Sequence, residues 1–356
     1  MTGPLAAVSD PLWLVALKAV VVFGLTMTMV PALVLAERRI SAWMQYRVGP
    51  DRVGPGGTLQ PMADLVKMLF KEEVKPSAAP GFLFTIAPAI AASCSLFMMA
   101  VVPFGGTLAL GDRRIPLVVA DVDIGVLVVL AASSLGVYGI TLGGWASDSK
   151  YSLLGGLRSS AQMISYELTL GVSLLGVLAL SHGRGGELGS FSLSDIVARQ
   201  AESGLWNCLK APLGCVLFII SMFAETNRLP FDLPEAEPEL VGGYHTEYSA
   251  MRFGLFFLGE YAAMFAGSCV VVCLFFGGWH LPFLVNTELV GPGGALLQLS
   301  AFLAKVLVFL FFFIHVRWTL PRFRYDQLMK LGWLVMLPLA LLNLLVTGGL
   351  VAAGVL

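Results

Sequence analysis

Residues 12–36 read LWLVALKAVVVFGLTMTMVPALVLA, and Lys18 is the single charged side chain among them. At a rise of about 1.5 Å per residue, a helix of this length measures about 38 Å, enough to cross a hydrocarbon core of about 30 Å. No Lys or Arg precedes the run, and Glu37-Arg38-Arg39 follows it where a signal peptide would have a cleavage site with small residues. The run therefore predicts a transmembrane helix and not a cleaved signal.

The composition extends this interpretation to the whole chain. Of the 356 residues, 57% are apolar and only 13% are charged, about half the charged share of an ordinary soluble domain. A water-soluble protein of this size could not cover its core with so few charged groups. The composition therefore excludes a soluble enzyme and a disordered chain. The net charge of −1 argues against a nucleic-acid binder, which would be basic.

Further apolar runs of similar length follow along the chain. Together with the first they lie near residues 12–36, 81–102, 122–145, 160–181, 209–226, 253–277, 297–318 and 331–353. Pro338 in the last run is compatible with a membrane helix, because neighbouring groups can bind the backbone atoms that it frees. The sequence predicts a single all-α membrane domain over residues 1–356, polytopic, with about eight transmembrane helices.

The distribution of Lys and Arg predicts the orientation of the chain. The loops after the first, third, fifth and seventh runs hold most of these residues, whereas the opposite side holds Arg113, Arg114, Arg184, Arg199 and Lys210. Because cytoplasmic loops carry the excess of positive charge, we expect the richer loops on the inner side and both termini on the outer side.

The first long inner loop, residues 37–80, combines turns with an amphipathic segment. Residues 47–57, RVGPDRVGPGG, contain the Gly and Pro residues typical of turns. From Gln60 to Glu73, apolar residues recur at i, i+3, i+4, i+7 and i+8, which is one face of a helix. They are Met62, Leu65, Val66, Leu69 and Phe70. Such a helix suits the membrane interface, and packing against a soluble partner is an equally good interpretation.

The second long inner loop, residues 225–252, is acidic. Three prolines prevent a continuous helix. Its acids are Glu225, Asp232, Glu235, Glu237, Glu239 and Glu247. A solvated acidic surface is the ordinary explanation of such a loop. Interleaved apolar and aromatic residues, such as Phe231, Tyr244 and Tyr248, indicate instead a loop that folds against another surface.

Carboxylates also occur inside the predicted spans, where an ionisable group costs about 3 kcal/mol on insertion scales. Glu167 and Glu260 each lie about two turns from the inner end of a span, and Glu225 closes a third span on the same side. Asp64 on the amphipathic helix could face the same level. Neighbouring carboxylates can pass protons. Alternatively, each acid pairs with an arginine, for example Glu225 with Arg228. The role of Lys305, in the seventh span, stays open.

Sequence signatures of bound metals, nucleotides and clusters are missing from the chain. It contains no C-x-x-C pair, no H-E-x-x-H and no G-x-G-x-x-G. We therefore expect the chain to bind no metal or redox cofactor itself.

Two longer motifs carry a family resemblance. The first is WMQYRVGP at residues 43–50, with Glu37-Arg38-Arg39 before it and QPMAD at residues 60–64 after it. The second is FAETNRLPFDLPEAE at residues 223–237. Both resemble the signatures of the H subunit of the proton-translocating NADH:quinone oxidoreductase, respiratory complex I, whose mitochondrial counterpart is NADH dehydrogenase subunit 1. The resemblance extends over the whole chain. Pro238 and a longer outer segment at 182–208 depart from the family pattern.

The resemblance implies a membrane subunit at the junction with the peripheral arm. Such a chain forms the channel and inner chamber for the substrate quinone and couples quinone reduction to proton translocation. Flavin and iron–sulfur clusters belong to partner subunits, and the isolated chain would have no catalytic activity. A multi-pass location in the bacterial plasma (inner) membrane follows, beside peripheral-arm and membrane-arm partners.

The resemblance also assigns residues to these roles. The proton relay maps onto Asp64, Glu167, Glu225 and Glu260. The quinone channel maps onto Arg38, Trp43, Asp64, Phe231, Arg252 and Phe257. The coupling loop maps onto Arg228, Asp232, Glu235, Glu237, Glu239 and Glu247.

Two alternatives compete with this hypothesis. The related membrane subunit of energy-converting hydrogenases would share the carboxylates but depart from the quinone-loop signatures, which are present here. A stand-alone ion transporter or structural anchor is disfavoured by the two elaborate inner loops and by the absence of internal repeats.

Overall fold

The computed structural model describes residues 10–110, 113–181, 189–235, 237–282 and 291–354. The long helices are α1 (Leu12–Met44), α3 (Gly81–Met98), α4 (Gly125–Ala146), α5 (Lys150–Leu180), α10 (Ala250–Phe275) and α11 (Pro292–Thr319). The last helix consists of α12 (Tyr325–Lys330), a π-helical turn (Leu331–Met336) and α13 (Leu337–Ala352). The shorter helices are α2 (Gln60–Phe70), α6 (Leu193–Ser203), α7 (Asn207–Lys210), α8 (Pro212–Glu225) and α9 (Glu237–Leu240).

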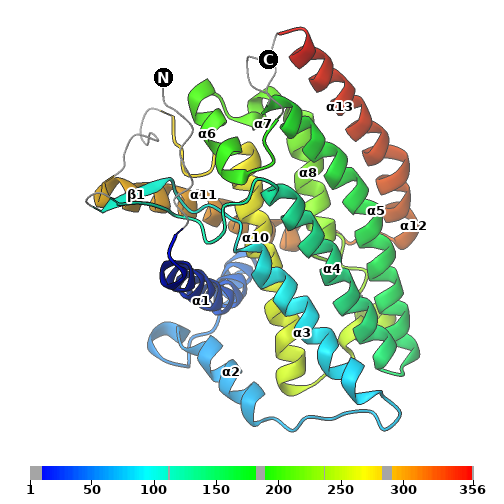
Figure 1. Cartoon of the computed structure of the whole chain (residues 1–356). Coiled ribbons are helices and arrows are strands. Elements are labelled where there is room, and N and C mark those ends of the chain that lie inside the picture. Colours follow the sequence, from blue (N-terminus) through cyan, green and yellow to red (C-terminus); the bar gives the residue numbers. More distant parts are fainter. Residues whose placement is uncertain (1–9, 111–112, 182–188, 236, 283–290, 355–356) are drawn as a thin grey trace.

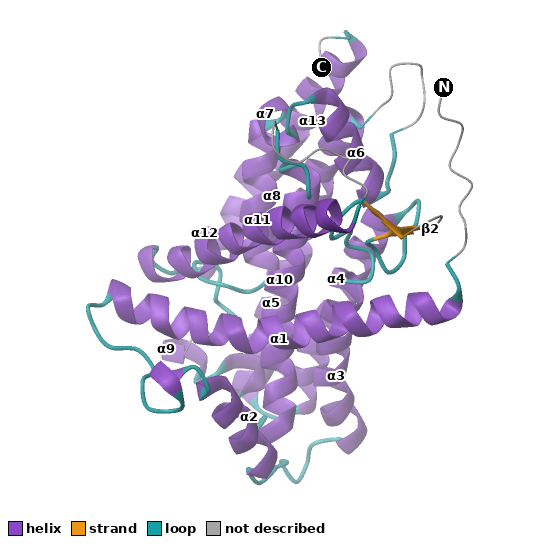
Figure 2. Cartoon of the chain, turned by 90° about the vertical axis from the view of Figure 1, so that its left-hand side faces the viewer, coloured by secondary structure: helices purple, strands orange, loops and turns teal. Residues whose placement is uncertain are grey.

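Helix α10 is the centre of the bundle. Of its most apolar stretch, 72% is buried, against 22% for α1. Helices α3 and α8 pack on it. Helix α4 packs on α3, α5 packs on α4 and α8, and α13 covers the outer side of α5 (Figure 1). In Figure 2, α1 and α11 lie across these upright helices, both in contact with α10. Leucine and phenylalanine side chains cover much of the outside, as expected where hydrocarbon is the solvent.

The all-α polytopic membrane fold is confirmed. Within the described part of the chain, seven helices are long and apolar enough to cross a membrane. The predicted span at 209–226 is shorter than expected, because α8 begins at Pro212 and has only 14 residues. Lys210 ends the separate short helix α7 just before it. The count of about eight spans therefore corresponds to seven long helices and one short apolar helix.

Three predicted boundaries were wrong. Helix α1 continues to Met44, so the inner loop predicted at 37–80 begins later, since no Gly or Pro interrupts residues 37–44. Helix α5 begins at Lys150 and not near 160, and the last helix begins at Tyr325 and not at 331. In each case polar residues continue the backbone hydrogen bonds of the helix beyond its apolar part, and hydropathy does not record that.

The connection between α3 and α4 contains a small hairpin that was not predicted. Strands β1 (Thr107–Leu110) and β2 (Arg113–Pro116) pair antiparallel, with Thr107 opposite Pro116. The backbone N–H of Gly106, beside this hairpin, donates to Gln298 of α11 at 2.9 Å. Of the outer segment at 182–208, residues 182–188 lie outside the described residues, and α6 forms most of the rest.

The amphipathic helix predicted from Gln60 is confirmed as α2, although it ends at Phe70 because Lys71 is extended. Its apolar residues Met62, Leu65, Leu69 and Phe70 are exposed, and none of its residues is buried. Helix α2 contacts α1 and α10. Its location in the membrane interface stays a prediction.

Candidate functional site

A buried group of charged side chains joins α1, α10, α11 and the loop that follows α8. The Arg228 guanidinium lies 2.7 Å from a Glu260 carboxylate oxygen and 3.3 Å from a Glu37 oxygen. Arg317 also pairs with Glu37, and the Tyr261 hydroxyl donates to Glu37 at 2.7 Å. We call these five residues the ionic cluster. Two carboxylates meet two guanidinium groups, so the cluster is formally neutral, which reduces the cost of burying it.

Sequence reasoning missed Glu37 and Arg317 as residues of this site. Glu37 was interpreted as following the first span, but α1 continues for two more turns beyond it. Val30, Leu33, Glu37 and Ser41 are all buried and share one face of α1. That spacing was visible in the sequence and could have indicated that Glu37 faces the interior.

The end of α8 is held so that Arg228 reaches the cluster. The Gln162 amide on α5 donates to the Ala224 carbonyl at 2.8 Å and to the Asn227 side-chain oxygen at 3.1 Å. Asn227 has φ 50°, a left-handed conformation that asparagine tolerates better than most residues. Arg228 thereby turns toward Glu260 and Glu37. The alternative pairing of Glu225 with Arg228 is absent among the contacts of the described residues.

The loop at 225–252 is folded against the bundle and is not a solvated chain. Asp232 is buried and pairs with Arg322 at 2.8 Å. Tyr244 and Tyr248 are buried as well, and Tyr248 stacks on Phe84 with ring centroids 4.1 Å apart. The interleaved aromatic residues therefore pack into the protein, as the sequence indicated.

Glu235 and His245 face each other in this loop, with Nδ1 and Oε1 3.8 Å apart. Burial, together with the nearby Glu260 and Asp232 carboxylates, raises the pKa of Glu235 well above its usual range. Burial lowers the pKa of His245 to about 4. At neutral pH His245 is therefore uncharged, and its contact with Glu235 is not an ion pair.

The other acids of the loop lie further out. Glu239 is exposed and pairs with Arg158 of α5 at 2.7 Å. Glu247 is half-buried. The side chain of Glu237 lies outside the described residues. The structure thus places Arg228, Asp232 and Glu235 inward and Glu239 at the surface.

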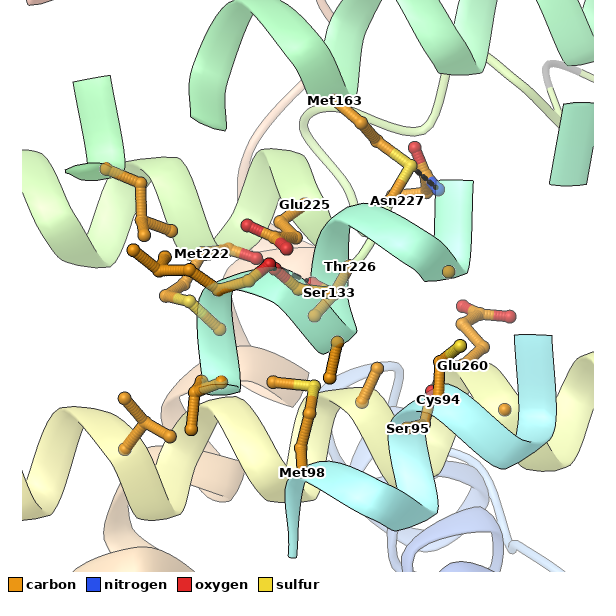
Figure 3. A pocket seen from close by; sticks show the side chains of 18 of the residues that line it. Cys94, Ser95, Met98, Ser133, Met163, Met222, Glu225, Thr226, Asn227 and Glu260 are labelled. Carbon is orange, nitrogen blue, oxygen red and sulfur yellow. Dashed lines mark hydrogen bonds between the residues drawn. The ribbon is translucent and has the colours of Figure 1, made fainter. Parts of the chain in front are cut away.

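A cavity of about 80 Å³ lies between α3, α4, α5, α8 and α10. Glu225 and Glu260 stand at separate places on its wall, and Ser95, Ser133 and Thr226 add polar groups to a largely apolar lining (Figure 3). A cavity of this size holds several water molecules, and its polar groups would bind them. The cavity therefore borders both Glu225 and Glu260 of the ionic cluster.

Glu167 lies beyond Glu225. It is paired with the Ser134 hydroxyl of α4, and the adjacent Ser133 is within hydrogen-bond reach of Glu225. Two of the four predicted relay acids, Glu225 and Glu260, therefore line one cavity, and Glu167 lies near Glu225. Asp64 lies apart from them on α2, 2.6 Å from Arg38 and partly exposed.

The candidate channel residues lie mostly on one side of the molecule. Arg38 and Asp64 link α1 to α2, and Trp43 near the end of α1 is 70% exposed. On α10, Arg252 pairs with Glu73 at 3.4 Å. Phe257 packs on Tyr261 with ring centroids 4.7 Å apart. Phe231 does not join them, because it is buried between Tyr166 and Phe323.

Other reactive side chains form no further site in the described ranges. No group of three or more His, Cys, Asp and Glu there has the arrangement of a metal site. The five cysteines are free thiols. The polar groups of the described site are carboxylates, guanidinium groups, hydroxyls and amides.

The fold and this site define a polytopic membrane subunit with paired ionisable groups in its interior. The profile of the NADH dehydrogenase family matches residues 17–348. H subunit 1 of the NADH-quinone oxidoreductase of Geobacter metallireducens is 52% identical over 331 residues, 93% of this chain and 94% of that protein. NADH-quinone oxidoreductase subunit 8 of Rhodothermus marinus is 49% identical over 358 residues, 97% of this chain and 98% of that protein.

The chain therefore belongs to the H-subunit family of NADH-quinone oxidoreductase, that of respiratory complex I, and is part of a multi-subunit oxidoreductase. The family resemblance read from the two signatures is confirmed. The H subunit of the Syntrophotalea carbinolica enzyme, 50% identical over 334 residues, belongs to the same group. The relatives favour the quinone hypothesis over the hydrogenase and transporter alternatives.

Proposed function

We propose that this chain forms the quinone channel and inner quinone chamber of its complex, and that it couples quinone reduction to proton translocation. The observation that carries the proposal is the cavity that joins Glu260 of the ionic cluster to Glu225. Water in this cavity, together with the two carboxylates, provides a path for protons from the α1–α10 side toward α4 and α5.

The ionic cluster is the element that would respond to quinone chemistry. Glu260 shares Arg228 with Glu37, so a change of charge near Glu37 alters how firmly Arg228 holds Glu260. A carboxylate released by its arginine binds a proton more readily. From there the path runs through the cavity to Glu225 and on to Glu167 beside Ser133 and Ser134.

The quinone channel would lie along α1, α2 and α10. The exposed apolar face of α2 suits a long hydrophobic tail, and the Arg38–Asp64 pair stands beside it. Arg252 and Phe257 supply a polar and an aromatic group on α10. Phe231 is buried against Tyr166 and Phe323. It would act through packing of the coupling loop and not through contact with the quinone.

Partner subunits and the membrane would surround this chain. The loop at 225–252 would face the peripheral-arm subunits, which hold the flavin and the iron–sulfur clusters, while this chain binds no redox cofactor. Other membrane-arm subunits would cover part of the lipid-side surface. The location would be the bacterial plasma (inner) membrane, with both termini on the outer side.

The test compares Glu225→Gln with the exposed control Glu239→Gln in the assembled complex. We expect Glu225→Gln to lower inhibitor-sensitive NADH:quinone reduction and proton pumping severalfold, because an amide cannot carry the proton. Electron transfer from NADH to an artificial acceptor upstream of the quinone should be unchanged. Glu239→Gln should resemble the parent protein. Unchanged quinone reduction and pumping in Glu225→Gln would contradict the relay.

A further inference from the structure

The end of α10 far from the ionic cluster is capped by side chains from three other elements. Gln200 of α6 donates to the Cys273 carbonyl at 2.8 Å, and Asn207 of α7 donates to the Leu274 carbonyl at 2.9 Å. These carbonyls belong to the last turn of α10, where no helical N–H is available to bind them. The cap therefore joins α6 and α7 to the end of the central helix.

Lys305 of α11 completes this cap. Its ammonium group donates to the carbonyls of Phe276, Gly278 and His280 at 2.7, 2.8 and 2.6 Å. The ammonium also lies 4.8 Å from the centre of the Trp206 ring, a favourable cation–π distance. The three contacts use all three N–H donors of a charged lysine. A neutral amine, with two N–H groups, would leave one carbonyl unpaired.

The same cap adjoins the cavity that Glu225 and Glu260 line. Leu274 lines the cavity with its side chain, and its carbonyl is the acceptor for Asn207. Leu193 of α6 lines the cavity as well, and Val197, one turn further along α6, packs on Gly278. In Figure 1, α6 and α7 lie over this end of the bundle. Apolar residues thus line this end of the cavity, and Lys305 binds the backbone carbonyls beyond them.

We propose that Lys305, together with Gln200 and Asn207, seals the cavity against the side of the membrane opposite the ionic cluster. The proposal rests on the proton path described above. Without the cap, water bound to the free carbonyl groups at the end of α10 would conduct protons that enter the cavity from the quinone side. A fixed positive charge beside an apolar wall opposes the passage of protons. Lys305 is therefore a positioning residue and a barrier, and not a carrier of protons.

The experiment uses the whole complex, reconstituted in liposomes. Lys305→Ala should raise the passive proton leak severalfold in the absence of NADH and should lower the number of protons pumped per NADH. NADH:quinone reduction in the presence of an uncoupler should be largely retained. Lys18→Ala is the matched control, because Lys18 also lies in an apolar helix but pairs with Asp10, away from the cavity. This control should not leak.

Added cations separate a barrier from a proton carrier. Butylammonium and guanidinium both supply N–H donors and charge to the three carbonyls, but guanidinium does not lose its proton at any ordinary pH. If Lys305 is a barrier, both cations reduce the leak of Lys305→Ala. If butylammonium alone restores pumping, Lys305 carries protons and the proposal is wrong.

Asn207→Leu is a milder substitution, and it provides the same test if the Lys305→Ala complex does not assemble. It removes the partner of the Leu274 carbonyl and should also raise the leak. If liposomes with the assembled Lys305→Ala or Asn207→Leu complex leak protons no faster than those with the parent complex, the proposed seal is wrong. That result is distinct from failure of the relay, which shows in Glu225→Gln and requires no change in leak.

Discussion

The Tyr261 hydroxyl donates a hydrogen bond of 2.7 Å to the Glu37 carboxylate, although 224 positions separate the two residues in the chain. The Arg228 guanidinium lies over the ring of the same tyrosine, 4.2 Å from its centre. Tyr261 therefore contacts one acid, Glu37, and one arginine, Arg228, of the cluster. Through these contacts α1, α10 and the loop after α8 are held as one unit.

Replacing Glu37 should destabilise this unit strongly. Glu37→Gln leaves Glu260 as the remaining acid of the cluster for Arg228 and Arg317, and breaking a buried ion pair from one side costs about 3–5 kcal/mol. Tyr261→Phe keeps the ring and loses one hydrogen bond to a charged group, at a cost of about 1.5–3 kcal/mol. Thermal dissociation of the complex should therefore occur at a lower temperature in Glu37→Gln than in Tyr261→Phe. The reverse order would contradict the central position of Glu37.

The docking of the acidic loop depends on Gly155. A Cβ atom at this position of α5 would lie 2.7 Å from the Tyr244 nitrogen and 2.9 Å from the Gly243 carbonyl carbon. Overpacking of this kind costs about 1–3 kcal/mol, and here backbone and not side chain must move. Gly155→Ala should speed hydrogen exchange at residues 243–248. Gly171, also on α5, has no atom within 4 Å of its ideal Cβ position, so Gly171→Ala should leave that exchange unchanged.

His245 should lower the stability of the loop in mild acid. Because burial lowers the pKa of His245 from 6.5 to about 4, the unfolded loop takes up a proton in this range and the folded loop does not. This proton uptake by the unfolded loop lowers the free energy of unfolding as the pH falls from 6.5 toward 4. The raised pKa of Glu235 acts in the opposite direction, since its stabilising proton is lost as the pH rises.

His245→Gln tests this pH dependence. It removes the group that takes up a proton on unfolding, so protection of residues 243–248 from hydrogen exchange should fall less steeply with acid than in the parent protein. Exchange rates are to be corrected for their intrinsic pH dependence. Identical slopes in the two proteins would show that His245 does not govern the loop.

Arg158 and Arg228 should differ greatly in importance. Arg158 is paired with exposed Glu239, and such surface pairs contribute about 0–1 kcal/mol. Arg228 is buried between two acids. Arg158→Gln should leave quinone reduction and thermal stability nearly unchanged, whereas Arg228→Gln should reduce both. Equal effects would mean that the loop surface contributes as much as the ionic cluster.

Hydropathy predicted most of the membrane helices because the length of an apolar run is a local property. The period of α2 was equally readable, since Met62, Leu65, Val66 and Leu69 repeat as a helix face. The boundaries at Met44, Lys150 and Tyr325 were not, because a helix continues wherever its backbone hydrogen bonds do, whatever the polarity of its side chains. The short α8 follows from Pro212, which begins a helix readily.

By itself, the sequence determined that this chain is an all-α membrane protein of the complex I H-subunit family, with acids inside its apolar spans. Only the tertiary structure decided which charges meet. Arg228 pairs with Glu260 and Glu37 and not with nearby Glu225, while Asp64 pairs with Arg38 and stays apart from the other acids. The physical reason is that a buried charge is stabilised by whichever partners the packing of several helices brings within a few ångströms, and spacing along one chain does not specify that.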